Sequence, residues 1–166
     1  LLDPALAEYY RDGVYVTLRL TPSMYHRFHA PLAARIREVR LVPGDAWNVN
    51  GPALRRVDRL YCRNERAVVC LQAASGWPLV TLVPVAAVLV ASLRLHVLGD
   101  TLPAASGGSH VVALDAACEK GEELGWFEHG STVVVLAPAG CELAGGIEPG
   151  IRMRMGRPLM RVPAEC

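Results

Sequence analysis

Hydrophobic and polar positions follow one another over short stretches of the chain, in the pattern that half-buried β-strands produce. The run VYVTLRL at 14–20 partly alternates, is rich in β-branched and aromatic residues, and stops at Thr21-Pro22. Residues 4–12 instead have helical spacing, with Asp3 as the predicted N-cap and Pro4 at the first helical position. Further strands are predicted at 33–42, 57–62, 66–73, 79–83, 85–90, 92–98, 110–114, 131–136 and 151–154.

Turn signals separate these segments at short intervals. They include Pro43-Gly44, Asn50-Gly51, Ser75-Gly76 and Gly107-Gly108. Short strands at such spacing are typical of a sandwich or barrel, so we predict a mainly β fold (α+β with few short helices). The 166 residues, 52% hydrophobic and 20% charged, indicate a single compact domain over 1–166. The stretch LPAASGGS at 102–109 is interpreted as a surface loop within it.

Charge and cysteine content exclude several classes of protein. The formal net charge is +1, so no global field favours nucleic acid, although residues 1–66 hold eleven arginines against seven acids and allow a local basic face. The five cysteines are odd in number and form no C-x-x-C pair, which argues against a disulfide framework or a zinc site. We therefore expect a reducing, cytoplasmic environment.

Neither the start of the chain nor its most apolar run reads as a membrane or targeting segment. The opening LLDPALAEYY has no basic region, no apolar core and no initiator Met, so we expect the native chain to begin upstream. The most apolar run, Leu79–Leu93, has fifteen residues with Pro84 inside, whereas a spanning helix needs roughly 20. Buried strands explain it better.

Two histidines form the first candidate site. The segment TPSMYHRFHAP at 21–31 places His26 and His29 three residues apart, and two imidazoles that titrate near neutral pH suit proton transfer. Taken alone, two loop histidines with ordinary hydrogen bonds explain the pattern as well. No metal is predicted, because no Cys pair or acidic cluster supplies the remaining ligands.

A second candidate combines LVPGDAWNVN at 41–50 with RNERAVV at 63–69. It places polar residues after a Pro-Gly turn in otherwise apolar surroundings. A structural turn with a solvated Arg63, Glu65 and Arg66 cluster explains it as well as a ligand site does.

The third candidate is the Gly130-Ser131 pair, which leads directly into a β-branched strand. Gly130 has no Cβ, so its carbonyl can be approached closely, and Ser131 supplies a hydroxyl to the same peptide bond. Such a pair can undergo an N→O acyl shift. The alternative is a common Gly-Ser turn before a strand.

The order of these motifs adds information that no single motif carries. The chain has YHRFHAP at 25–31, VPGDAWNVN at 42–50, RNER at 63–66, KGEELGWFEHGST at 120–132 and MGRPLMR at 155–161. Over nearly its whole length it thereby resembles the phosphatidylserine decarboxylase family. The resemblance implies that the Gly130-Ser131 bond cuts itself and that Ser131 becomes a covalent pyruvoyl cofactor. It also implies His29 as the base for self-cleavage and His26 as the proton donor in decarboxylation.

The resemblance further implies conversion of phosphatidylserine, or a related serine phospholipid, to phosphatidylethanolamine. The implied partners are the phospholipid at a membrane surface and the cleaved small chain 131–166, with a homodimer left open and no nucleic acid. The implied location is peripheral, on the cytoplasmic side of the cell membrane. Two alternatives stay open: a pyruvoyl decarboxylase of a soluble amino acid, and a non-catalytic lipoyl-like β module modified at Lys120.

Some features depart from the family pattern. The family has a self-processing Asp in a P-A-D-G segment and membrane-docking helices, and these 166 residues contain neither. The family's glycine-containing strand VGA…VGSI reads VPVAAVLVASL at 83–93. We therefore expect residues 1–166 alone to process poorly, because His29 would lack the carboxylate that orients it.

Overall fold

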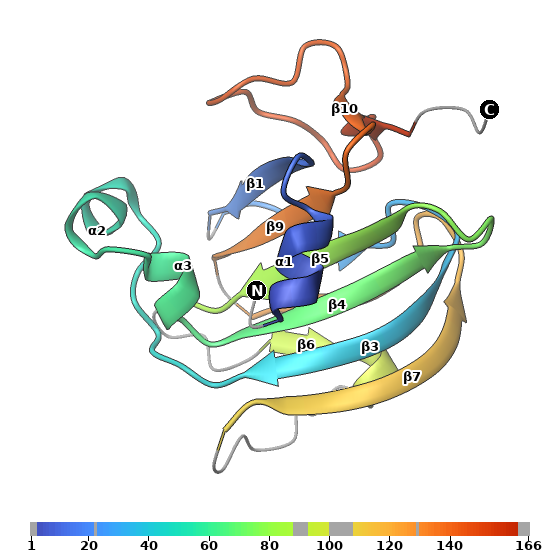
Figure 1. Ribbon diagram of the computed structural model, residues 1–166. Helices are drawn as coiled ribbons and strands as arrows, with labels where there is room; N and C mark the ends of the chain where they lie inside the picture. The colour runs from blue at the N-terminus through green and yellow to red at the C-terminus, as the bar shows by residue number, and fades with distance from the viewer. Residues whose placement is uncertain (1–2, 22, 88–92, 100–107, 129, 163–166) are drawn as a thin grey trace.

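The computed structural model describes residues 3–21, 23–87, 93–99, 108–128 and 130–162, and it confirms the mainly β fold with few short helices (Figure 1). Six antiparallel strands form the larger sheet in the order β1-β9-β5-β4-β3-β7. Their bounds are β1 Val14–Leu20, β3 Ala34–Val42, β4 Arg66–Ala73, β5 Leu79–Val85, β7 His110–Cys118 and β9 Ser131–Ala137.

A smaller sheet covers one face of the larger one. It has the order β2-β8-β6, with β2 Arg27–His29, β8 Glu123–Phe127 and β6 Leu93–Leu95, and a 3-10 turn η1 follows at His96–Leu98. Its buried side chains, Phe28, Leu124 and Phe127 among them, join Val69 and Val133 of the larger sheet in the main hydrophobic core. A short ribbon of β10 (Glu142–Leu143) and β11 (Met160–Arg161) lies beyond β9.

Helices cover part of the opposite face. They are α1 (Pro4–Tyr9) and α3 (Leu60–Arg63), while α2 (Gly51–Arg56) stands out to one side (Figure 1). Leu6 of α1 and Tyr61 of α3 pack on a second apolar cluster that includes Val68 and Val85. The predicted cap of the first helix is confirmed, since the Asp3 carboxylate accepts hydrogen bonds from the backbone of Ala5 and Leu6.

The strand pairing makes neighbours of the four strand ends that flank two connections. In the larger sheet β1 pairs with β9, and in the smaller sheet β2 pairs with β8. The connection 21–26 leads from β1 to β2, and 128–130 leads from β8 to β9. Leu20 at the end of β1 pairs with Ser131, and Arg27 at the start of β2 pairs with Trp126 near the end of β8, so the strand ends that flank the two connections are neighbours.

Several sequence-based elements need correction. Residues 57–62 are not a strand: Asn50 caps α2, Pro52 lies in its first turn, and Arg59 has a left-handed conformation before α3. Residues 151–154 are irregular, between glycines with positive φ at 150 and 156. The first helix ends at Tyr9, three residues earlier than predicted. The predicted strand 92–98 shortens to β6 and continues as η1.

Other differences concern boundaries and omissions. The predicted strand 85–90 contributes only Val85, the last residue of β5, while Ala86 and Ala87 are irregular and the rest lies outside the described residues. Of the predicted loop 102–109, residues 102–107 also lie outside them. Strands β2 and β8 of the smaller sheet were not predicted, because one is three residues long and the other contains Gly125.

Candidate active site

Ser131 opens β9 and is completely buried. It pairs with Leu20 of β1, and its Oγ has no hydrogen-bond partner in the structure. Because strand side chains alternate, Ser131 shares the core-facing side of β9 with Val133. A buried hydroxyl without a partner is costly, at about 1–3 kcal/mol, so its presence calls for a specific explanation.

Its neighbour Thr132 provides an internal comparison. Thr132 is equally buried, and its Oγ1 also lacks a partner. It lies on the opposite side of β9, the side that Val134 presents to the second apolar cluster. Only Ser131 is bonded directly to Gly130, which is partly exposed at the end of the connection from β8.

His26 lies beside the segment that leads to the Gly130-Ser131 bond. Its carbonyl accepts a hydrogen bond of 2.9 Å from the backbone N–H of Phe127, the last residue of β8. The His26 ring nitrogen Nε2 is buried and has no hydrogen-bond partner. His26 Nε2 and Ser131 Oγ are thus both buried and unpartnered, and the backbone bond from His26 to Phe127 places the two residues on neighbouring segments.

His29 is held differently, because both of its ring nitrogens have partners. Nδ1 lies 2.8 Å from the carbonyl oxygen of Gly121, and Nε2 lies 2.8 Å from the hydroxyl of Tyr25. A carbonyl only accepts, so Nδ1 carries the proton and Nε2 accepts from Tyr25. The Tyr25 ring also stacks on the imidazole, with 5.8 Å between ring centroids.

The structure therefore separates the two predicted histidines. His26 is bonded to Phe127 at the end of β8, whereas His29 is opposite Glu123 at its start, and the pairing register shifts between Phe28 and His29. Within the described ranges, neither ring forms a hydrogen bond with Ser131. The Gly121 carbonyl occupies the orienting position on Nδ1 that a carboxylate holds in an Asp-His-Ser triad.

A charged cluster lies next to His29 on the smaller sheet. The Glu123 carboxylate accepts from Arg27 and lies 2.9 Å from His96 Nε2, while Arg27 also stands over the Trp126 ring. Partial burial opposes ionisation of Glu123, but the hydrogen bonds from His96 and Arg27 prevail and hold its pKa below the usual value. Glu123 is thus an anion at neutral pH and anchors this edge of the site.

The second sequence candidate contains a buried structural network, and of its predicted solvated residues Arg63 is exposed, Glu65 is half-buried and Arg66 is buried. Asn64 is fully buried: its amide donates to the carbonyls of Trp47 and Ala86, and its oxygen accepts from the backbone N–H of Trp47. Arg66 is also buried and donates to the carbonyls of Cys62 and Asn64, and burial lowers its pKa. The expectation of a solvated Arg66 is therefore wrong, because its β4 position lies under α3.

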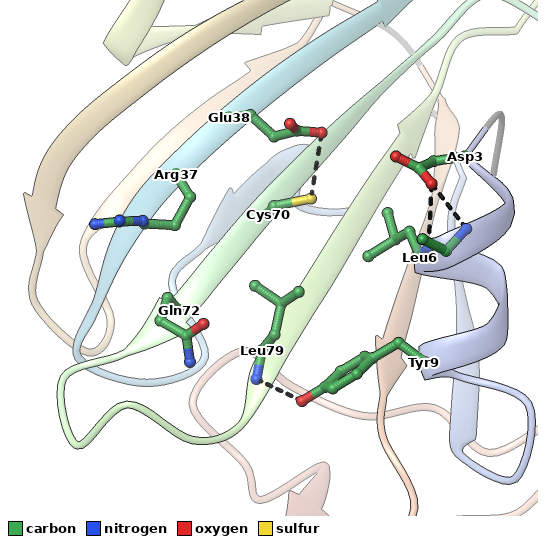
Figure 2. Close-up of a pocket in the computed structure, with 9 residues that line it drawn as sticks. Asp3, Leu6, Tyr9, Arg37, Glu38, Cys70, Gln72 and Leu79 are labelled. Atoms are coloured by element: carbon green, nitrogen blue, oxygen red, sulfur yellow. Dashed lines mark hydrogen bonds between the residues drawn. The ribbon is translucent and has the colours of Figure 1, made fainter.

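Two hollows lie away from Ser131. One, of about 380 Å³, lies between α1 and the outer face of the larger sheet and is lined by Asp3, Tyr9, Glu38 and Cys70 among others (Figure 2). Another, of about 260 Å³, lies between Leu95 and Glu123.

Among the described residues, no group of three or more His, Cys, Asp or Glu side chains is arranged to hold a metal ion, and no helix is long and apolar enough to cross a membrane.

Comparisons with known proteins cover nearly the whole chain. The sequence profile of the phosphatidylserine decarboxylase family matches residues 1–161. The phosphatidylserine decarboxylase proenzyme of Halorhodospira halophila is 43% identical over 164 residues, which are 97% of this chain and 54% of the relative. The proenzyme of the same name from Anaeromyxobacter sp. (strain K) is 38% identical over 162 residues, 95% of this chain and 57% of the relative. The chain thus spans about half the length of the curated relatives it matches.

Proposed function

Because this chain belongs to the phosphatidylserine decarboxylase family, we propose that it carries the self-cleaving, catalytic part of an enzyme that converts phosphatidylserine to phosphatidylethanolamine. The observation that carries the proposal is the Ser131 hydroxyl, which is fully buried, unpartnered and adjacent to the Gly130 carbonyl. Ser131 would become the pyruvoyl cofactor after the Gly130-Ser131 bond is cut.

Self-cleavage follows from the chemistry of this peptide bond. Ser131 Oγ attacks the Gly130 carbonyl carbon, the Ser131 nitrogen leaves, and an ester joins the two residues. Elimination then releases the Gly130 carboxylate and leaves a dehydroalanine at position 131. Addition of water to its tautomer releases ammonia and leaves the pyruvoyl group.

The first step needs a base, and we assign it to His29. The Gly121 carbonyl holds the proton on Nδ1, so Nε2 provides the basic lone pair. In the described arrangement that lone pair accepts from Tyr25, 2.8 Å away, and His29 lies opposite Glu123, so the role of base requires a rearrangement, with rotation of the imidazole, that brings Nε2 to Ser131 Oγ before cleavage. The stacked Tyr25 ring would guide that rotation.

The pyruvoyl group, once formed, supplies a carbonyl that withdraws the electrons left when carbon dioxide departs, a task that no ordinary side chain performs. We assign His26 as the donor that protonates the substrate carbon. Its Nε2 is buried and unpartnered, so no competing hydrogen bond holds it. Its backbone is fixed to Phe127, four residues before Ser131.

The fold also explains how the two pieces would stay together. Strand β9 lies between β1 and β5 and is hydrogen-bonded to both. A cut at its first residue leaves both ladders intact, so the segment 131–166 would remain part of the sheet.

The proposed location is peripheral, on the cytoplasmic side of the cell membrane, where the phospholipid substrate lies, and a homodimer is compatible with it.

The proposal is tested with the full-length protein that contains this chain. Incubated with vesicles of phosphatidylserine, it should release carbon dioxide and form phosphatidylethanolamine, and the Ser131→Ala variant should form none. Decarboxylation of free serine instead, with no lipid product, would favour a soluble amino-acid substrate. Acylation of Lys120, exposed in the turn between β7 and β8, without chain cleavage would favour a lipoyl-like module.

A further inference from the structure

We propose that the segment 46–63, here called the projection, is the surface with which the enzyme binds an anionic phospholipid bilayer. The projection comprises α2, α3 and the residues that precede them, and it stands out at one side of the larger sheet (Figure 1). The inference deepens the proposed function, on which its biological purpose rests, by assigning a docking surface to the lipid substrate.

The exposed side chains of the projection combine positive charge with apolar and aromatic groups. The projection has four exposed arginines and one acidic residue, Asp58, so its net charge is +3. They are Arg55, Arg56, Arg59 and Arg63. Trp47 is 45% exposed and Leu54 is 36% exposed. Basic residues are attracted to anionic lipids and Trp prefers the interface between water and lipid, so the two kinds of group favour the same surface.

The projection is fixed to the end of the sheet where the Gly130-Ser131 bond lies. Asn64 links the backbone of Trp47 to the carbonyl of Ala86 through hydrogen bonds of 2.7–2.9 Å. Ala86 directly follows Val85, and Val85 pairs with Thr132 in β9. A bilayer that touches the projection would therefore lie at the end of the molecule where a lipid headgroup must reach position 131.

Buried contacts also hold the projection in place against the rest of the fold. Buried Val49, Leu60 and Ala87 form a small core beneath it. The Asn64 side chain beneath the surface is completely buried. Preorganised contacts lower the entropy cost of binding, so a small patch of this kind suits reversible docking.

A second exposed basic and apolar segment belongs to another part of the fold, after β9. The loop 145–162 contains four arginines and the exposed side chains of Ile151 and Met155. It leaves the end of β9 opposite Ser131 and lies above β1 and β9, apart from α2 and α3 (Figure 1). The loop matches the projection in charge and differs in place, so it provides the control.

The experiment measures binding of the full-length protein to vesicles by sedimentation. Vesicles contain phosphatidylcholine with or without phosphatidylglycerol, an anionic lipid that is not the substrate. The triple variant Arg55→Gln, Arg56→Gln, Arg59→Gln should bind anionic vesicles on the order of 100-fold more weakly, from about fivefold per arginine. Trp47→Ala should weaken binding at high salt, where charge attraction is screened. The matched variant Arg152→Gln, Arg154→Gln, Arg157→Gln should bind like the parent.

The outcomes separate this inference from the proposed function. If the control loop variant loses binding and the projection variant keeps it, the docking surface is wrong. Equal loss in both variants would indicate nonspecific charge attraction and would also overturn it. Dispersed short-chain phosphatidylserine tests the chemistry alone: the projection variant should decarboxylate it at the parent rate. A parent protein that docks yet decarboxylates neither substrate form would defeat the proposed function and leave the docking surface standing.

Discussion

The backbone N–H of Phe127 donates a hydrogen bond of 2.9 Å to the carbonyl of His26. This bond ties the end of the histidine connection to the end of β8, just before Gly130. The pairing of β1 with β9 and of β2 with β8 makes that contact a consequence of the fold. Two motifs about 100 residues apart in the sequence thereby meet at the proposed cleavage site.

Replacement of the two buried hydroxyls on β9 should give opposite results. Ser131→Ala removes the nucleophile, so the full-length chain should remain uncut. Thr132→Val removes an equally buried, unpartnered hydroxyl from the other side of the strand and should cut normally. Denaturing gel electrophoresis after expression distinguishes them. Normal cutting of Ser131→Ala would show that the Ser131 hydroxyl is not the nucleophile.

The two histidines should separate by function. His29→Ala should leave uncut precursor, because a serine hydroxyl without a base is a poor nucleophile at neutral pH. His26→Ala should still cut and then decarboxylate about 10²–10⁴-fold more slowly, the usual loss when a positioned proton donor is removed. Gel analysis and lipid product assays of both variants test this. If His26→Ala stops cleavage and His29→Ala does not, the two roles are reversed.

The smaller sheet should tolerate no side chain at Gly125. A Cβ there would lie 2.0 Å from the Arg94 carbonyl oxygen and 2.7 Å from the Phe28 ring. Gly125→Ala should therefore lower the free energy of unfolding by about 2–3 kcal/mol and slow self-cleavage. Gly145→Ala is the control, because its Cβ would meet no atom within 4 Å. Denaturant unfolding of both glycine variants, each in the uncleaved Ser131→Ala background, gives their free energies of unfolding. Equal stabilities would refute the close packing at Gly125.

The ion cluster at Glu123 predicts a pH dependence of stability. Its folded-state pKa lies below the ordinary value of 4.5, so its ionised form stabilises the fold fully above that pH. Glu123→Gln should be less stable than the parent at pH 7, and the difference should shrink as the pH falls below about 4.5. Glu119→Gln, on the neighbouring turn, should show no such difference. Unfolding curves at several pH values measure it, and a pH-independent difference would exclude the ionic contribution.

Local pattern predicted much of the fold, but not the environments in the candidate site. The continuous run RAVVCLQA predicted β4 with its observed bounds, and Asp3-Pro4 predicted the start of α1. Residues 57–62 resemble a strand in composition, yet the Asn50 cap and the left-handed Arg59 direct the chain into helices. Local sequence could not distinguish His26 from His29, because their partners, Phe127 and Gly121, come from the other end of the chain.

Asn64 lies in the RNER motif at 63–66, where the sequence alone assigns it no role. Glu65 and Arg66 separate it from the buried apolar run 67–71, so the local pattern gives no sign that Asn64 is buried. Its role depends on the carbonyls of Trp47 and Ala86, which only the tertiary fold brings together.

The most direct test of the central claim is a denaturing mass spectrum of the full-length parent protein. The account predicts two chains, the second beginning at position 131 with a pyruvoyl group in place of serine and therefore blocked to N-terminal sequencing. Ser131→Ala protein should give one mass. A parent protein that decarboxylates phosphatidylserine as a single intact chain, with Ser131 unchanged, would contradict the account.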